Sequence, residues 1–350
     1  MTKPNTIRAI TGILLALVAT QVWAQDTVTL RKSERRGNKV LGTIKPASRT
    51  NLIVETGGIE RDIPVNEIER IGLAGEPTAL RQGRTSIFSG QYEQALESLN
   101  SVRMPSGASD IMQQEAAFYR ASAYANLALR GSGSVSDAVS LLRAFLTKQG
   151  RTSIHYYPAV ELLGQLADQV GRYENAAKYY QQLAKAPWPE YKLKSYVLEG
   201  NSLRAAGNPD EAVMRFAEAL KVPSKDAAAL RQQTLAKIGQ AACVAEGGDA
   251  ETALATLDQV IAQNDATDAG LFALAYLAQG AANRKAQQPL EAILSYLHID
   301  LLYFQQQAAH AEALYYLSEL WPQVNNPDRG VQARSLLKER YGSTGWAKKD

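Results

Sequence analysis

Cysteine and histidine are scarce in this chain of 350 residues. Cys243 is its one cysteine, and His155, His298 and His310 are its three histidines. A single cysteine excludes an intramolecular disulfide and a cysteine metal cluster, so packing alone must hold the fold together. No histidine lies in an HExxH pattern or three or four residues from a second suitable ligand. The sequence therefore predicts no metal site and no cofactor.

The common catalytic and nucleotide-binding motifs are also missing. The sequence contains no GxSxG, no Walker motif and no Rossmann fingerprint after a strand, and the glycine-rich stretch 131–137 lies between expected helices. We interpret Cys243 as a small core residue and the histidines as packing or capping residues. These absences predict a protein that is not an enzyme. The alternative, an enzyme, would be favoured by a deep pocket in which His155, His298 or Cys243 converged.

Strong net charge is absent as well. The chain has 38 basic and 35 acidic residues, with 45% hydrophobic and 21% charged residues overall. This composition is typical of a folded protein. A nearly neutral chain has no overall field that would attract nucleic acid or anionic lipid, so we expect no nucleic-acid partner.

The N-terminus has the pattern of a secretory signal peptide, which we predict over residues 1–24. A basic start precedes the apolar stretch 9–20, and Val22 and Ala24 occupy the −3 and −1 positions before a cut at Gln25. The apolar core is short for a membrane span, and no later stretch is long and apolar enough to cross a bilayer. We therefore predict a soluble exported protein, periplasmic or extracellular in a bacterium. An uncleaved anchor is the alternative, and the sequence leaves open whether the segment is cleaved or retained.

Residues 25–75 are rich in β-forming residues, unlike the rest of the chain. DTVTLR, VLGTI, TNLIVET, IERDIP and ERIGLA predict five short strands, with a single helical turn at PVNEI and a hairpin at Gly57–Gly58. Five strands with a one-turn helix before the last resemble the small SH3-like or Sm-like β-barrel. Because so small a module is only marginally stable alone, we expect it to dock on the first helices.

A basic loop in this module is the second candidate site. It contains Arg31, Lys32, Arg35, Arg36 and Lys39. One interpretation is a contact with a polyanion such as a cell-wall polymer, which gives the alternative function of polyanion binding. The other interpretation is a solvated turn, because an acid interrupts the run and no aromatic residue is interleaved to stack a base.

Six related decapeptides follow in residues 76–350. They are GQYEQALESL, GSVSDAVSLL, GRYENAAKYY, GNPDEAVMRF, GDAETALATL and QQPLEAILSY. Each has alanine at its sixth place and a bulky Leu, Tyr or Phe at its tenth, and the alanines are 36 to 43 residues apart. This period predicts stacked helical hairpins. The alanine is expected where two helices cross closely, with the bulky residue four places on along the same face.

A small residue twelve places before the alanine completes the pattern. It is Gly83, Gly164, Gly200, Ala241 or Gly280. Together with prolines near the ends of the second helices, the pattern resembles the tetratricopeptide repeat (TPR). The ending RYGSTGWAKK is similar to that of repeats in exported bacterial TPR adaptors, although the family's tryptophan is not kept and Asn126 replaces a small residue in one unit. We predict a mainly α fold: a TPR-like α-solenoid of about seven helical hairpins, preceded by the small SH3-like β module.

The resemblance implies a function and candidate residues. Stacked hairpins curve, and their first helices line a concave groove. The family's groove-facing positions fall on Arg84, Ile87, Gln165, Asp168, Asn201, Arg204, Ile238, Leu277 and Arg284. The implied function is a non-catalytic scaffold or adaptor that binds a protein or peptide partner in this groove. The alternative for each residue is a contact between neighbouring repeats, and the partner and the oligomeric state remain open.

Overall fold

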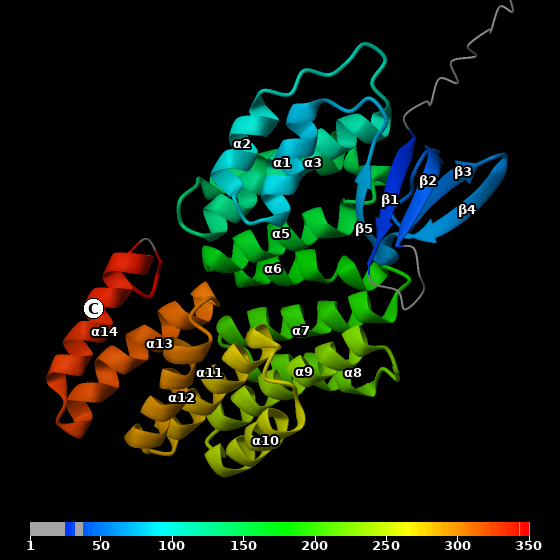
Figure 1. Cartoon of the computed structure of the whole chain (residues 1–350). Coiled ribbons are helices and arrows are strands. Elements are labelled where there is room, and N and C mark those ends of the chain that lie inside the picture. Colours follow the sequence, from blue (N-terminus) through cyan, green and yellow to red (C-terminus); the bar gives the residue numbers. More distant parts are fainter. Residues whose placement is uncertain (1–24, 32–37, 343, 350) are drawn as a thin grey trace, which may run out of the picture.

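The computed structural model describes residues 25–31, 38–342 and 344–349. Within these residues one small antiparallel β-sheet is followed by fourteen α-helices, which confirms the predicted mainly α class. Figure 1 shows the sheet at one side of a curved stack of helices. The predicted signal peptide, residues 1–24, lies outside the described residues.

The sheet has five strands and a one-turn helix before the last, as predicted. Its elements are β1 (Asp26–Leu30), β2 (Lys39–Ile44), β3 (Asn51–Thr56), β4 (Ile59–Pro64), the 3-10 turn Val65–Glu67 and β5 (Ile68–Gly72). The strand order is β4-β3-β2-β1-β5, and every neighbouring pair is antiparallel. Gly57 and Gly58 form the predicted hairpin turn with positive φ angles of 59° and 81°.

The prediction of a closed barrel is wrong. Strands β4 and β5 are the two ends of the sheet order, and no pairing joins them among the described residues. The apolar face of the sheet is covered by helices instead: Val28, Leu52 and Ile71 belong to one buried cluster with Leu80 and Leu99 of the first hairpin. Because the helices remove this face from water, the sheet does not need to close on itself.

The fourteen helices form seven antiparallel hairpins, the predicted number, and successive hairpins stack along the array (Figure 1). The first four hairpins are α1 (Thr78–Phe88) with α2 (Tyr92–Asn100), α3 (Asp110–Leu129) with α4 (Val135–Lys148), α5 (Tyr156–Gln169) with α6 (Tyr173–Tyr180), and α7 (Pro189–Ala205) with α8 (Pro209–Lys221). The last three are α9 (Ala227–Glu246) with α10 (Ala250–Gln263), α11 (Ala269–Lys285) with α12 (Pro289–Leu302), and α13 (Gln307–Leu320) with α14 (Pro327–Tyr341).

A small residue on the first helix and a bulky one on the second form the repeated contact within a hairpin. The sixth-place alanines are completely buried: Ala95, Ala138, Ala176, Ala212, Ala253 and Ala292. In four of these hairpins the tenth residue of the decapeptide lies directly on a glycine of the first helix. A β-carbon on Gly164 would lie 2.3 Å from the Tyr180 ring, and one on Gly280 would lie 2.6 Å from the Tyr296 ring. The glycines are therefore required by the approach of the side chain on the second helix.

Within the described part of the chain, none of the helices combines the length and the apolar character that crossing a membrane requires.

The replacement Gly164→Ala tests this contact. Alanine in a helix is normally more stable than glycine by about 1 kcal/mol. Here the added methyl group would collide with the fully buried Tyr180 ring, so we expect a loss of about 1–3 kcal/mol instead. The measurement is the free energy of unfolding in urea. The control Gly270→Ala lies in α11 against the flexible end of Arg231, 3.4 Å away, and should be neutral or stabilising; equal effects of both replacements would contradict the packing.

Candidate functional site

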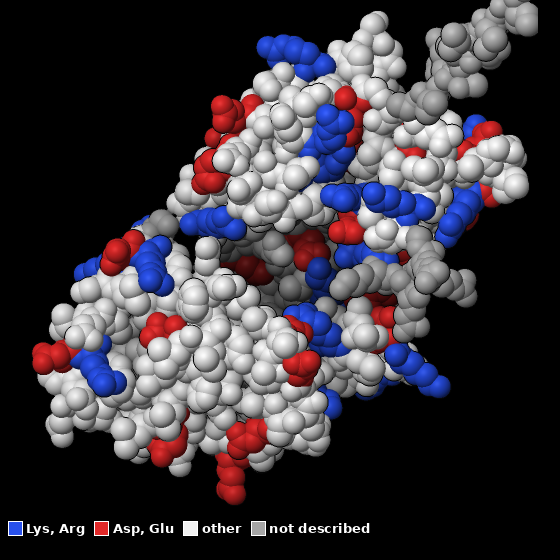
Figure 2. All heavy atoms as spheres, viewed as in Figure 1, with Lys and Arg blue, Asp and Glu red and all other residues white. Residues whose placement is uncertain are grey.

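The concave face of the array is hollowed. Figure 2 shows the hollow in the middle of the molecule, over α5–α7 of Figure 1, with acidic side chains inside it and basic side chains on its rim. Along most of the array neighbouring first helices contact one another, for example α7 with α9 and α9 with α11. The concave face is therefore built from residues of several hairpins that are far apart in the sequence.

Two of the predicted groove residues act electrostatically on one carboxylate. Glu312 on α13 is partly exposed, and the charges of Arg204 on α7, Lys349 near the chain end and Arg284 on α11 act on it. Burial raises the pKa of the Glu312 carboxyl above its ordinary value, and the three cations oppose this rise. Among the described residues this carboxylate has no salt bridge within 4.0 Å, so it can accept hydrogen bonds from a ligand.

Both arginine side chains are held in place by neighbouring residues but can still bind a ligand. Arg204 Nη1 donates to Glu246 Oε1 over 2.7 Å, while its buried Nε has no hydrogen-bond partner in the part of the chain that is described. The Arg284 guanidinium lies 3.7 Å from the centre of the Tyr316 ring, a cation–π contact. The site thus combines two oriented guanidinium groups, an unpaired carboxylate and an aromatic ring.

The predicted groove residues Gln165 and Asp168 on α5 and Asn201 on α7 are partly exposed. Asp168 accepts hydrogen bonds from the hydroxyls of Tyr180 and Ser202, each over 2.7 Å, and burial raises its pKa. Asp168 therefore links α5, α6 and α7. Gln165 and Asn201 are half-buried beside it, and they extend the polar surface along the concave face.

The other predicted groove residues do not belong to this polar surface on the concave face. Arg84 is only 5% exposed and pairs with Glu76 and Glu115. Ile87 is half-buried and lines a different pocket. Ile238 is buried, and Leu277 is half-buried against the C-terminal core. The physical reason at the first repeat is the sheet, which docks against the start of the array and covers positions that a bare repeat would expose.

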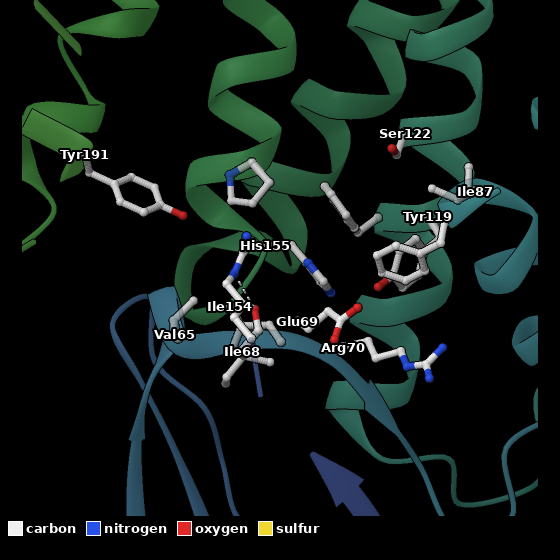
Figure 3. Close-up of a pocket in the computed structure, with 14 residues that line it drawn as sticks. Val65, Ile68, Glu69, Arg70, Ile87, Tyr119, Ser122, Ile154, His155 and Tyr191 are labelled. Atoms are coloured by element: carbon white, nitrogen blue, oxygen red, sulfur yellow. Dashed lines mark hydrogen bonds between the residues drawn. The ribbon is translucent and has the colours of Figure 1, made fainter. Parts of the chain in front are cut away.

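A pocket at this junction was not found by sequence reasoning. It has a volume of approximately 190 Å³ and lies where β5 meets α1, α3, α5 and α7. Figure 3 shows Tyr191 entering from one side and Tyr119 from the other, with His155 between them. The His155 ring stacks on Phe118 with 4.0 Å between the ring centres. No local sequence motif predicts this pocket, because its lining comes from strands, helices and connecting segments that are far apart in the sequence.

His155 belongs to a buried charge network. Its Nε2 is hydrogen-bonded to Glu115, whose other oxygen is 3.3 Å from Arg84, and Arg84 in turn lies 2.6 Å from Glu76. Burial and the Glu115 charge raise the pKa of the neighbouring Tyr119 hydroxyl well above its ordinary value. Neither Tyr119 nor Ser122 is hydrogen-bonded to His155 among the described residues, so the pocket holds a fixed histidine without an activated nucleophile.

The other two histidines lie elsewhere. His298 stacks on Tyr276 with 4.3 Å between ring centres, and its Nδ1 is 2.8 Å from the Leu294 carbonyl oxygen. His310 is completely buried between Asp300 and Tyr341, at 2.7 and 2.8 Å. Cys243 is buried in an alanine-rich stretch of α9. The residues that would have favoured an enzyme are therefore not brought together.

The basic loop is described only at its ends. Arg31 is exposed, and its Nε donates to the Ile68 carbonyl oxygen over 3.2 Å, while Lys39 is exposed at the start of β2. Lys32, Arg35 and Arg36 lie outside the described residues. Polyanion binding by this loop stays a prediction.

Comparisons with known proteins identify the helical fold. No family model and no curated protein sequence matches the chain. A solved tetratricopeptide repeat protein from Parabacteroides merdae matches with a TM-score of 0.54 and 13% identity, over 77% of this chain and 96% of that one. The Rap protein in complex with Competence and Sporulation Factor matches with a TM-score of 0.49 and 12% identity, over 76% and 74% of the two chains. At 13% identity the likeness to the Parabacteroides merdae protein shows a TPR-like fold and nothing more specific.

The replacement Arg84→Met tests whether this predicted groove residue is structural. It would leave the carboxylates of Glu76 and Glu115 buried without their shared cation, which should cost about 3 kcal/mol of folding free energy. Chemical denaturation measures the loss. The control Arg81→Met removes an exposed charge from the same helix and should change stability by less than about 0.5 kcal/mol; a similarly mild effect at Arg84 would show that the network is not structural.

Thiol chemistry tests the assignment of Cys243 as a core residue. Burial raises the pKa of the Cys243 thiol to about 11, so only about one molecule in a thousand carries the reactive thiolate at pH 8. We expect almost no alkylation of the native protein by iodoacetamide over an hour and complete alkylation in urea, as measured by mass spectrometry. Rapid alkylation of the native protein would contradict the assignment.

Proposed function

We propose that this protein is a non-catalytic scaffold that binds a protein or peptide partner in the hollow on its concave face. The observation that carries the proposal is the group formed by Arg204, Arg284, Glu312 and Tyr316. These residues come from α7, α11 and α13, and they combine oriented donors, an unpaired acceptor and an aromatic face. TPR-repeat proteins, with which the chain shares its fold, are typically non-catalytic.

The chemistry of this group suits an extended peptide. A peptide backbone offers carbonyl oxygens to a guanidinium and N–H groups to a carboxylate, and its side chains can contact an aromatic ring. The mixture of charges in the hollow disfavours a ligand of one strong charge, because each cation of the group has an acid near it. A partner with alternating polar and apolar side chains matches this surface better than a polyanion does.

We propose that the protein acts in the cell envelope. Its support is the N-terminal pattern of a basic start, an apolar stretch at 9–20 and small residues before Gln25. In an envelope protein that carries a single buried cysteine, the repeated helix contacts provide the stability that disulfides often provide elsewhere. The scaffold would thus bind another envelope protein, or a segment of one.

Selection from a random linear peptide library, followed by fluorescence anisotropy, tests the proposal. We expect selected peptides to bind the protein saturably and to lose at least tenfold in affinity when Arg204→Glu and Arg284→Glu are combined. The loss follows because these changes reverse both guanidinium charges beside Glu312. The control Lys221→Glu reverses an exposed charge at the end of α8, outside the group, and should leave the affinity unchanged. Failure to select any peptide, or equal affinity for the double variant, would overturn the proposal.

A further inference from the structure

The outer surface of α12 carries a line of four leucines. Leu290, Leu294 and Leu301 are 57%, 59% and 67% exposed, and Leu297 between them is half-buried. Their spacing of four, three and four residues places all four on one narrow stripe of a helix with 3.6 residues per turn. We call these four residues the leucine stripe. Leu302, the last residue of the helix, and Phe304, two residues beyond it, are 63% and 43% exposed.

The stripe is peculiar to α12 and is not a property of the repeat. The residues that correspond to Leu290 in the earlier hairpins, two places before the anchor alanine, are Glu93, Ser136, Glu174, Asp210 and Glu251. The residues that correspond to Leu297, five places after the alanine, are Asn100, Arg143, Gln181, Ala217 and Asp258. At these two places the five earlier second helices carry polar or small residues, whereas α12 carries leucine; at the place of Leu294, α8 carries the exposed Met214.

Helix α12 is therefore apolar on two sides. Its inner side packs Ala292, Ile293, Tyr296 and Ile299 into the C-terminal core. A helix that is apolar on its outer side as well is normally covered in the working protein, since a contiguous exposed apolar surface marks an interaction site. In the described structure nothing covers Leu290, Leu294 and Leu301, whereas Leu297 packs in part against the C-terminal core. Figure 2 shows a largely uncharged surface over this part of the molecule.

We propose that the leucine stripe is the interface of a homodimer, in which α12 packs antiparallel against α12 of a second copy. The spacing of four, three and four residues is symmetric about its midpoint, so an antiparallel two-fold pairing can place leucine opposite leucine along the whole stripe. An axis through the midpoint of the stripe pairs Leu290 with Leu301 of the second copy, and Leu294 with Leu297 of the second copy. The same spacing of alternating four and three residues allows leucine side chains of two helices to interdigitate.

The size and charge of the surface fit a second copy. Two copies of the stripe, with Leu302 and Phe304, would bury on the order of 1,000 Å² in total, the lower end of what a specific protein–protein interface needs. No charged residue interrupts the stripe, so the pairing buries no unpaired charge. A lipid surface fits less well, because α12 has no lysine or arginine and carries Glu291 and Asp300.

This interface is compatible with the proposed binding hollow. The stripe lies on a second helix, on the outer side of the array, whereas the group around Glu312 comes from first helices on the concave face. The dimer would therefore leave two hollows open, one in each copy. Two linked hollows would bind a partner that carries two copies of the recognised segment more tightly than either hollow alone.

Sedimentation equilibrium of the full chain tests the dimer. We expect a reversible monomer–dimer equilibrium, and we expect Leu294→Glu to raise its dissociation constant at least tenfold because the new charge would be buried at the two-fold axis. Circular dichroism should be unchanged, since residue 294 is exposed in one copy. The matched control is Met214→Glu at the equivalent place of α8, where the side chain is 57% exposed; it should leave the equilibrium unchanged.

Cysteine cross-linking tests the register, in a Cys243→Ala background. A mixture of L294C and L297C proteins should form a disulfide between the two proteins faster than a mixture of L290C and L294C, which the antiparallel pairing keeps apart. The proposal is overturned if the protein is a monomer at every concentration, if Leu294→Glu and Met214→Glu act equally, or if both mixtures cross-link at the same rate. It is also overturned if only neutral lipid vesicles, and not a second copy, protect the cysteines from alkylation.

Discussion

One steric requirement recurs through the helical part of the structure: two helices of a hairpin must approach closely enough for a bulky side chain to rest on a glycine. At Gly164 and Gly280 the space that a methyl group would need is already filled by Tyr180 and Tyr296. The buried alanine of the second helix permits the same close approach from the other side. The buried alanine returns every 36 to 43 residues, and a glycine lies opposite the bulky residue in four of the six hairpins that carry it. This close approach sets the geometry of the hairpins and, through it, the curvature of the array.

The curvature determines which side chains can act together. Arg204 and Arg284 are eighty residues apart, yet both act on Glu312 because the array curls. The sheet has an equally specific effect at the other end, where it buries the Arg84 network and creates the pocket around His155. The same stack presents a different surface outward, and only on α12 is that surface leucine-rich. Inner and outer faces of one hairpin can therefore serve different contacts.

Features that depend on local spacing were predictable from the sequence, whereas features that depend on contacts between distant elements were not. The six anchor alanines predicted six hairpins, the two helical segments after them predicted the seventh, and the β-rich runs predicted five strands with a one-turn helix. Closure of the barrel was wrong because helices, not strands, cover the sheet. Counting from the anchor alanine placed Arg84 in the groove, but Glu76 and Glu115 enclose it. Glu312 was not predicted as a groove residue because the last hairpin lacks the anchor pattern.

The central claim is that the concave hollow is the binding surface, and hydrogen–deuterium exchange measures it most directly. A bound peptide should slow amide exchange in the segments of α7, α11 and α13 that contain Arg204, Arg284 and Glu312, because their helices would open less often in the complex. Exchange in the sheet, residues 26–30 and 39–72, should not change. Protection confined to the sheet or to the outer face of α12, with none around Glu312, would contradict the account.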